Sequence, residues 1–285
     1  MKCYKIAGHT LALIGEAEEA LIDKLWGFGV FLTSNEPDWE VRIVDEVELP
    51  SYKPNNTFDF ENGAMHCGVG YQNGCYIYEM TPAAGCKVPP MKRRYDGGRE
   101  VLMSHVNDIS VLRFSLWMAF TLLGMHHMVM PIHSSVIVRN GKAVLFLGES
   151  GTGKSTHTRL WLENIDGAHL LNDDSPILAI EDGKVFAYGS PWSGKTDCYK
   201  DECFEVAGFV RLSQAPFNRI TRQPVLTAIS ALQPSLPPAI AYCEDGQDCQ
   251  MQMISEILSG VPVYRMECLP DAAAARMSCG TIFGD

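Results

Sequence analysis

A glycine-rich segment in the middle of the chain has the residue types and spacing that suit phosphate binding. Residues 148–156 read GESGTGKST, which fits the pattern G-x-x-x-x-G-K-[ST]. Such glycines let successive backbone N–H groups point at one spot, and a helix that follows adds its positive dipole end. An apolar run at 143–147 precedes the segment and helical spacing at 156–163 follows it. We therefore predict that the segment holds the phosphates of ATP with Mg²⁺.

The residues of this segment have different predicted tasks. Lys154 places a positive charge on the β and γ phosphates, and Ser155 offers its hydroxyl to Mg²⁺. The predicted ATP contacts are Gly148, Glu149, Ser150, Gly151, Thr152, Gly153, Lys154, Ser155 and Thr156.

Two adjacent carboxylates follow the next apolar run of the chain. Asn172, Asp173 and Asp174 come directly after Leu170 and Leu171. Such a pair is often only a turn or a helix cap. Within reach of a Mg-nucleotide, one carboxylate can complete the metal shell and the other can accept a proton from a hydroxyl nucleophile.

A histidine begins the strand that leads to the glycine-rich segment. His133 stands fifteen residues before Gly148, and Asn140-Gly141 predicts a tight turn between strands at 132–138 and 143–147. A hairpin brings the start of its first strand beside the end of its second, so His133 is expected beside Gly148. There it could donate to a phosphate, share a metal or tune a base, or it could be a satisfied core residue.

These three features occur together in one known arrangement. The run 133–136 (HSSV), GESGTGKST, and the run 171–174 (LNDD) resemble the catalytic domain of HPr kinase/phosphorylase. They are also similar to the phosphoenolpyruvate carboxykinases, which share that nucleotide-binding core. The resemblance covers roughly residues 130–215 and continues plausibly to 285.

The resemblance implies a role for each matching position. Lys154 contacts the β and γ phosphates, and Asp173 is the base toward the acceptor hydroxyl. Asp174 supports the metal with Ser155, although the two aspartates could exchange roles. His133 takes the active-site histidine position, which is a metal ligand in the carboxykinases.

The chain also departs from these families. Ser134 stands where the kinase family typically has glycine, and the family's glycine-rich acceptor signature is not evident downstream. The first half does not resemble the N-terminal domain of HPr kinase. The resemblance therefore extends neither to HPr as the substrate nor to oxaloacetate chemistry.

A second loop offers contacts for an acceptor. Residues 189–196 read GSPWSGKT, and backbone amides with Lys195 could hold an anion there, while Trp192 could be a platform. The alternative is a turn with a solvated lysine. Arg211 and Arg219 flank a predicted strand end, where one could neutralise transition-state charge or both could form surface pairs.

The pattern of elements predicts an α/β protein with a mixed sheet and two domains. Residues 1–125 form a smaller strand-rich domain that ends in an apolar helix at 107–125. Residues 126–285 form a P-loop-containing, phosphoenolpyruvate carboxykinase-like catalytic domain. An Asn73-Gly74 pair predicts a hairpin in the first domain, and 176–188 predicts one in the second.

Composition limits the partners. The chain has 285 residues and a formal net charge of −11, which disfavours nucleic acid and anionic membranes. The apolar run 114–125 is too short to span a bilayer and the N-terminus lacks signal-peptide shape, so we expect the protein in the cytoplasm.

Basic residues 92–99 predict a mobile surface loop, or less often a docking patch for an acidic partner. A homo-oligomer is expected by analogy only.

Three functions fit these observations. The first is an ATP-dependent kinase that transfers the γ-phosphate to a hydroxyl acceptor, either a small molecule or a protein serine. The second is an ATP-binding regulatory protein without phosphotransfer. The third is a simple ATPase.

Overall fold

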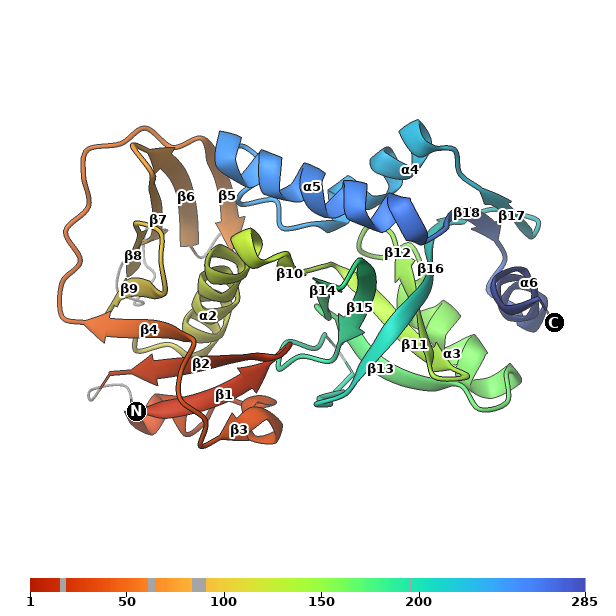
Figure 1. The fold of residues 1–285 in the computed structure, drawn as a ribbon, viewed down its shortest axis with the longest axis horizontal. Helices are drawn as coiled ribbons and strands as arrows, with labels where there is room; N and C mark the ends of the chain where they lie inside the picture. Colours follow the sequence, from red (N-terminus) through yellow and green to blue (C-terminus); the bar gives the residue numbers. More distant parts are fainter. Residues whose placement is uncertain (16–18, 61–64, 84–90, 195, 285) are drawn as a thin grey trace. The chain divides into compact units, whose positions relative to one another are not determined.

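The chain forms two compact units in the computed structural model (Figure 1). The structure describes all residues except 16–18, 61–64, 84–90, 195 and 285. The N-terminal unit contains Met1–His127 and Pro238–Cys249, and the C-terminal unit contains Met128–Pro237 and Gln250–Asp285. The first boundary between the units follows His127, whereas the sequence pattern predicts a boundary after residue 125. The sequence pattern does not indicate that Pro238–Cys249 belongs to the N-terminal unit.

A mixed sheet forms most of the N-terminal unit. Its order is β3-β1-β2-β4-β9-β8-β7-β6-β5, with β2–β4 and β4–β9 parallel and the other neighbours antiparallel. The strands are β1 (Lys2–Ile6), β2 (His9–Ile14), β3 (Leu32–Thr33), β4 (Trp39–Val44), β5 (Asn56–Phe60), β6 (Met65–Gln72), β7 (Cys75–Pro82), β8 (Met91–Tyr95) and β9 (Glu100–Ser104). Short helices α1 (Glu19–Ile22) and η1 (Phe28–Phe31) connect β2 to β3.

The predicted hairpin at Asn73-Gly74 is confirmed. The predicted loop at 92–99 is wrong for 92–95, whereas 96–99 form the turn between two strands. Gln72 pairs with Cys75 across the turn, and Asn73 and Gly74 have φ of 52° and 79°, as a two-residue turn of this hand requires. Residues 91–95 instead form β8 between β7 and β9. Two neighbouring strands supply backbone partners there, and this outweighs the charged local composition.

The long apolar helix is a core element of the N-terminal unit. Helix α2 (Ile109–Gly124) begins at Asp108, whose side chain accepts hydrogen bonds from the N–H groups of Ser110 and Val111, a standard N-cap. With η2 (Met125–His127) it forms a stretch long and apolar enough to cross a membrane, but 72% of that stretch is buried within the protein. Burial accounts for its apolar surface.

The C-terminal unit is built on a second mixed sheet. Its order is β10-β14-β15-β16-β12-β11-β13, and β18 pairs with both β16 and β17. The strands are β10 (Val129–Pro131), β11 (Ser134–Arg139), β12 (Lys142–Leu147), β13 (His169–Asp174), β14 (Ile177–Glu181), β15 (Lys184–Tyr188), β16 (Cys203–Gln214), β17 (Arg219–Arg222) and β18 (Val263–Cys268). The helices are α3 (Lys154–Asn164), α4 (Val225–Leu232), η3 (Gln233–Ser235) and α6 (Ala272–Phe283). Helix α5 (Glu244–Gly260) begins in the N-terminal unit and continues in this one, because the division between the units follows Cys249.

Two helices cover one face of this sheet. Phe146 of β12 packs with Trp161 of α3, with ring centroids 5.7 Å apart, and α6 joins the same core through Ala274, Ala275 and Cys279. The Ser278 hydroxyl accepts a hydrogen bond from Trp161 Nε1 at 2.9 Å and lies 3.0 Å from His157 Nε2. This buried contact fixes α3, the helix that follows the glycine-rich segment, against α6.

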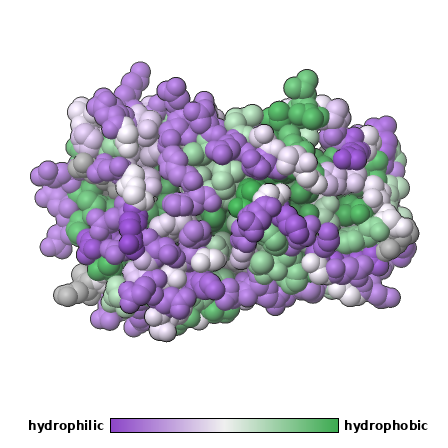
Figure 2. Space-filling model, viewed as in Figure 1, coloured by the Kyte–Doolittle hydropathy of each residue, from purple (hydrophilic) through white to green (hydrophobic). Residues whose placement is uncertain are grey.

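Helix α4 carries two strongly exposed apolar side chains. Figure 2 shows hydrophobic residues protruding over α4, where Val225 and Leu226 are 62% and 80% exposed. Ala228, Ala231 and Leu232 are buried, so α4 carries apolar side chains on both its inner and its outer face.

The stability of the C-terminal unit should depend on pH through His157. Burial lowers the pKa of His157 from 6.5 to about 4, so the unfolded chain binds a proton that the folded chain does not. Stability should therefore fall by about 3 kcal/mol as the pH falls from about 6.5 to about 4. Urea unfolding of His157→Gln, which keeps a donor for Ser278 but does not titrate, should show a much shallower pH slope.

The half-exposed His169 of β13 supplies the control. His169→Gln makes the same substitution away from the Ser278 contact and so reports what the substitution alone does to the slope. Equal slopes in wild type and His157→Gln would contradict the assignment of this pH dependence to His157.

Candidate functional site

Three segments far apart in the sequence end at the same edge of the second sheet. In the β11–β12 hairpin, Ser134 pairs with Leu147, the last residue before Gly148. On its other side β11 pairs with β13, so that Ser135 faces Asp173 and Ser134 faces Asp174. This register brings His133, the glycine-rich segment and the aspartate pair together, as the hairpin pattern predicted for His133 and Gly148.

The glycine-rich segment forms a tight loop that leads directly into α3. Gly148 has φ of 150°, and a Cβ there would lie 2.5 Å from Thr152 Oγ1, so only glycine fits. Gly153 has φ of 106° and precedes Lys154, the first residue of α3. No side chain of the described residues caps this helix, so its first N–H groups remain available to an anion.

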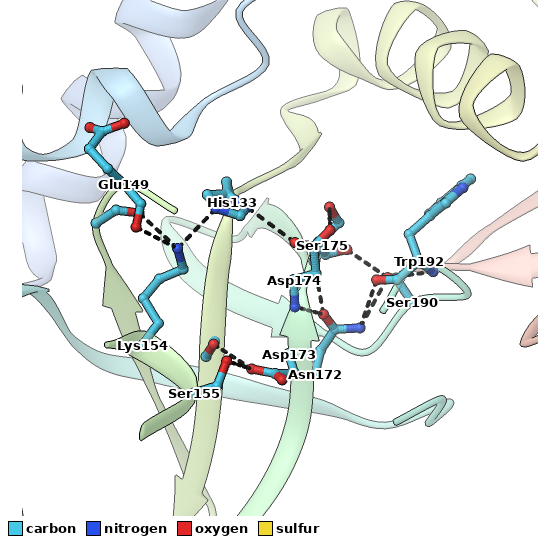
Figure 3. A network of polar contacts seen from close by, with 12 residues as sticks. His133, Glu149, Lys154, Ser155, Asn172, Asp173, Asp174, Ser175, Ser190 and Trp192 are labelled. Atoms are coloured by element: carbon cyan, nitrogen blue, oxygen red, sulfur yellow. Dashed lines mark hydrogen bonds and ion pairs between the residues drawn. The ribbon is translucent and has the colours of Figure 1, made fainter. Parts of the chain in front are cut away.

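Lys154 is folded back onto the loop. Its Nζ donates to the carbonyl oxygens of Gly148 at 2.8 Å and Glu149 at 3.3 Å, and lies 2.9 Å from His133 Nε2 (Figure 3). Burial lowers the pKa of Lys154, against the opposing carboxylates of Asp174, Glu149 and Asp173. An ammonium donates equally to carbonyl and to phosphate oxygens, so this group has the chemistry to bind an anion.

His133 connects Lys154 to Asp174. Because an ammonium only donates, His133 Nε2 accepts from Lys154. The proton of the neutral ring is then on Nδ1, which faces Asp174 Oδ1 at 3.3 Å. Burial raises the pKa of Asp174, but the interaction with His133, the hydrogen bond from Ser175 and the charge of Lys154 outweigh it, so the net shift is downward.

Asp173 is held by three hydroxyl groups from three segments. Its Oδ1 accepts from Ser135 at 2.6 Å and from Ser155 at 3.1 Å, and its Oδ2 accepts from Thr196 at 2.8 Å. Asp173 as a whole residue is 7% exposed, whereas the side chain of Asp174 is 39% exposed. The two aspartates thus differ in environment: Asp173 is buried beside Ser155, and Asp174 is partly exposed beside His133.

Asn172 shapes the turn that carries both carboxylates. Its Oδ1 accepts from the N–H groups of Asp174 and Ser175 at 3.0 Å each. Its Nδ2 donates to Ser190 Oγ and to the backbone oxygen of Trp192, both at 3.2 Å. The loop at 189–196 is therefore fastened to the aspartate turn.

The acceptor contacts predicted in this loop are only partly described. Trp192 is 5% exposed, and its ring is turned away from Lys154 and His133 (Figure 3). Lys195 lies outside the described residues. Thr196 was not predicted to contact Asp173, because no spacing in the sequence marks a threonine after a glycine-lysine pair as a site residue.

The two arginines at the strand ends have different surroundings. Arg211 Nη2 lies 2.6 Å from Glu149 Oε1 in the loop, and its Nη1 donates to the carbonyl of Ala231 at 3.1 Å. Arg219 pairs with Glu267 in β18. Arg211 is therefore next to the glycine-rich loop, and Arg219 forms an ion pair at the strand surface.

A pocket adjoins the first turn of α3. It has a volume of about 480 Å³, and its lining includes Thr152, Gly153 and Thr156 on one side and Gln214, Leu269 and Pro270 on the other. It is open to solvent and part apolar, as a nucleoside requires.

Comparisons with known proteins give little further information. No protein-family model and no curated protein sequence matches the chain. Among solved structures, the chain is similar to the Hpr(Ser) kinase/phosphatase from Coxiella burnetii, at 15% identity and a TM-score of 0.31, over 54% of this chain and 93% of that one. That likeness is too weak to assign an activity. The two sheets and their helices make the chain a mixed α/β protein.

The Asp174–His133 contact leads to a measurable pKa. Replacing His133 with Asn removes the ring that holds the pKa of Asp174 down, so this pKa should rise, as a ¹³C NMR titration of the carboxyl group would show. Ser155→Ala is the matched control, because the Ser155 hydroxyl donates to Asp173 and not to Asp174, so its loss should leave the pKa of Asp174 unchanged. An unchanged pKa of Asp174 in His133→Asn would contradict the assigned interaction between these two side chains.

Proposed function

We propose that the chain is an ATP-dependent kinase that transfers the γ-phosphate of ATP to a hydroxyl acceptor. The observation that supports this most is the meeting of a phosphate-type loop, Lys154 and two unlike carboxylates at one sheet edge. A phosphate site alone needs no second carboxylate. A transfer site needs one for the metal and one for the proton of the acceptor.

The proposed ATP site follows from the loop and the start of α3. The triphosphate lies on the N–H groups of residues 148–156, and Lys154 leaves its carbonyl partners for the β and γ phosphates. The nucleoside occupies the pocket lined by Thr152, Gly153 and Thr156. In this proposal the protein is cytoplasmic and uses neither nucleic acid nor membrane as a partner.

Ser155 and Asp173 form the proposed Mg²⁺ site. Their oxygens are 3.1 Å apart, and hydroxyl and carboxylate oxygens are the donors that Mg²⁺ prefers. When bound, Mg²⁺ neutralises charge on the β and γ phosphates. This assignment exchanges the two aspartate roles that the family resemblance implies, because Asp173, not Asp174, contacts Ser155.

Asp174 is the proposed base. It is partly exposed, and its lowered pKa keeps it ionised at neutral pH. The acceptor hydroxyl gives its proton to Asp174, and its oxygen bonds to the γ-phosphorus. The bond from that phosphorus to the β–γ bridging oxygen breaks, and ADP leaves. His133 orients Asp174 from the other side.

Two aspartate variants separate the roles. Asp174→Asn should bind Mg²⁺ and an ATP analogue with near wild-type affinity but lose transfer by at least about a hundredfold. Asp173→Asn should instead weaken the Mg²⁺ dependence of ATP binding, as titration calorimetry would show. Transfer is measured with γ-labelled ATP against serine peptides, small alcohols and the protein itself.

Each outcome of this assay is informative. If phosphate transfer were unchanged in Asp174→Asn and also in Lys154→Ala, the proposed kinase function would be contradicted. Phosphate release that matches ATP loss with no labelled acceptor would favour a simple ATPase. Tight ATP binding without turnover would favour a regulatory protein.

The loop itself is tested by a pair of glycine variants. Gly148→Ala places a Cβ against Thr152 Oγ1, so the loop must rearrange and ATP affinity should fall at least about tenfold. Gly141→Ala is the matched control: Gly141 also has a positive φ, of 72°, but nothing lies within 4 Å of its Cβ position. It should lose about 1 kcal/mol of stability and keep ATP affinity. Equal affinities for both variants would contradict the loop assignment.

A further inference from the structure

Three side chains with metal-binding atoms meet within the N-terminal unit. His126 comes from η2, and Asp245 and Cys249 come from the first turns of α5. His126 Nδ1 is 3.4 Å from Cys249 Sγ, and His126 Nε2 is 3.2 Å from Asp245 Oδ2. One ligand atom from each residue lies within 4.8 Å of the other two.

The local structure fixes these side chains. Asp245 and Cys249 are four residues apart on α5, so they lie on the same face of the helix. Asp245 Oδ2 also accepts a hydrogen bond from the hydroxyl of the buried Tyr76 at 2.9 Å. A carboxylate oriented by a second partner is typical of metal ligands.

The cluster can be interpreted in two ways. As a Cys-His-Asp hydrogen-bonded set it would need a reactive thiolate. Such a thiolate must also be reached by a substrate, whereas Cys249 is only 7% exposed, so this interpretation is disfavoured. A metal ion, in contrast, displaces the thiol proton, and the carboxylate of Asp245 beside the sulfur then favours the bound cation.

We propose that His126, Asp245 and Cys249 bind one divalent transition-metal ion of the zinc class. Sulfur, imidazole nitrogen and carboxylate oxygen together suit Zn²⁺ and not Mg²⁺ or Ca²⁺. Tetrahedral Zn²⁺ sets its ligand atoms about 3.3–3.8 Å apart. A single ion binds only one ring nitrogen of His126, whereas the ring now contacts Cys249 through Nδ1 and Asp245 through Nε2, so metal binding requires the His126 ring to turn. His126 is 45% exposed and provides the entry path, and a water molecule takes the fourth position.

The metal would have a structural consequence. The segment Pro238–Cys249 belongs to the N-terminal unit although it follows the unit's other residues by more than a hundred positions. A metal bound to His126 and to α5 would join this segment to the end of α2 and η2. The free energy of binding would then add to the stability of the N-terminal unit.

Cobalt provides a direct test, because a thiolate bound to Co²⁺ gives an intense near-ultraviolet charge-transfer band. Titration of the full chain with Co²⁺ should produce this band at one equivalent, and Zn²⁺ should remove it. Cys249→Ser should abolish the band, and His126→Asn and Asp245→Asn should weaken Co²⁺ binding at least about tenfold. The phosphate loop, which contains no cysteine, cannot give this signal.

Two control variants test for adventitious binding. Cys203→Ser removes an exposed thiol, and His127→Asn removes the neighbouring histidine, whose ring packs against Trp39. Both should keep the band. No band in the wild type, or a band that persists in Cys249→Ser, would overturn the proposal. If circular dichroism shows that Cys249→Ser is unfolded, Asp245→Asn provides the test instead. The proposal would be overturned if Asp245→Asn bound Co²⁺ with wild-type affinity and if Zn²⁺ raised its melting temperature as much as it raises that of the wild type.

Discussion

The buried carboxylate of Asp173 is the constraint on which the C-terminal unit's site depends. Burying a charged carboxylate is costly unless several donors reach it. Here Ser135, Ser155 and Thr196 each donate a hydroxyl. These residues come from β11, from α3 and from the loop after β15, so satisfying one carboxylate fixes three segments relative to one another.

A second chain of contacts sets the electrostatics next to that carboxylate. Lys154, His133 and Asp174 form a donor-to-acceptor series, which keeps a cation and an anion close without direct contact. In the proposed function, the neutral ring between them lets the lysine leave for a phosphate while the aspartate keeps its hydrogen bond. Phosphate binding would then change one partner of His133 and preserve the other.

Sequence patterns predicted the parts of this site that depend on local chain geometry. The turn at Asn140-Gly141 set the register of the β11–β12 hairpin, and that register placed His133 beside the loop. The partner of β11 on its other side was not predictable, because pairing with β13 depends on the whole sheet. For the same reason the environments of Asp173 and Asp174, which are identical residue types, could be distinguished only in three dimensions.

The other structural features that the sequence did not predict also depend on long-range packing. Basic residues at 92–94 lie in β8 because β7 and β9 flank it, and Pro238–Cys249 joins the N-terminal unit through contacts that no local pattern encodes. The cluster of His126, Asp245 and Cys249 was invisible in the sequence, since its histidine stands more than a hundred residues before its other two members.

The most direct test of the account is a crystal structure with a non-hydrolysable ATP analogue and Mg²⁺. The account predicts that Ser155 and Asp173 contact the metal, that Lys154 has moved from the Gly148 carbonyl to the phosphates, and that Asp174 faces an open space next to the γ-phosphate. A metal held by Asp174 with Asp173 turned toward that space would contradict the assignment of the two carboxylates. Nucleotide bound elsewhere would contradict the site itself.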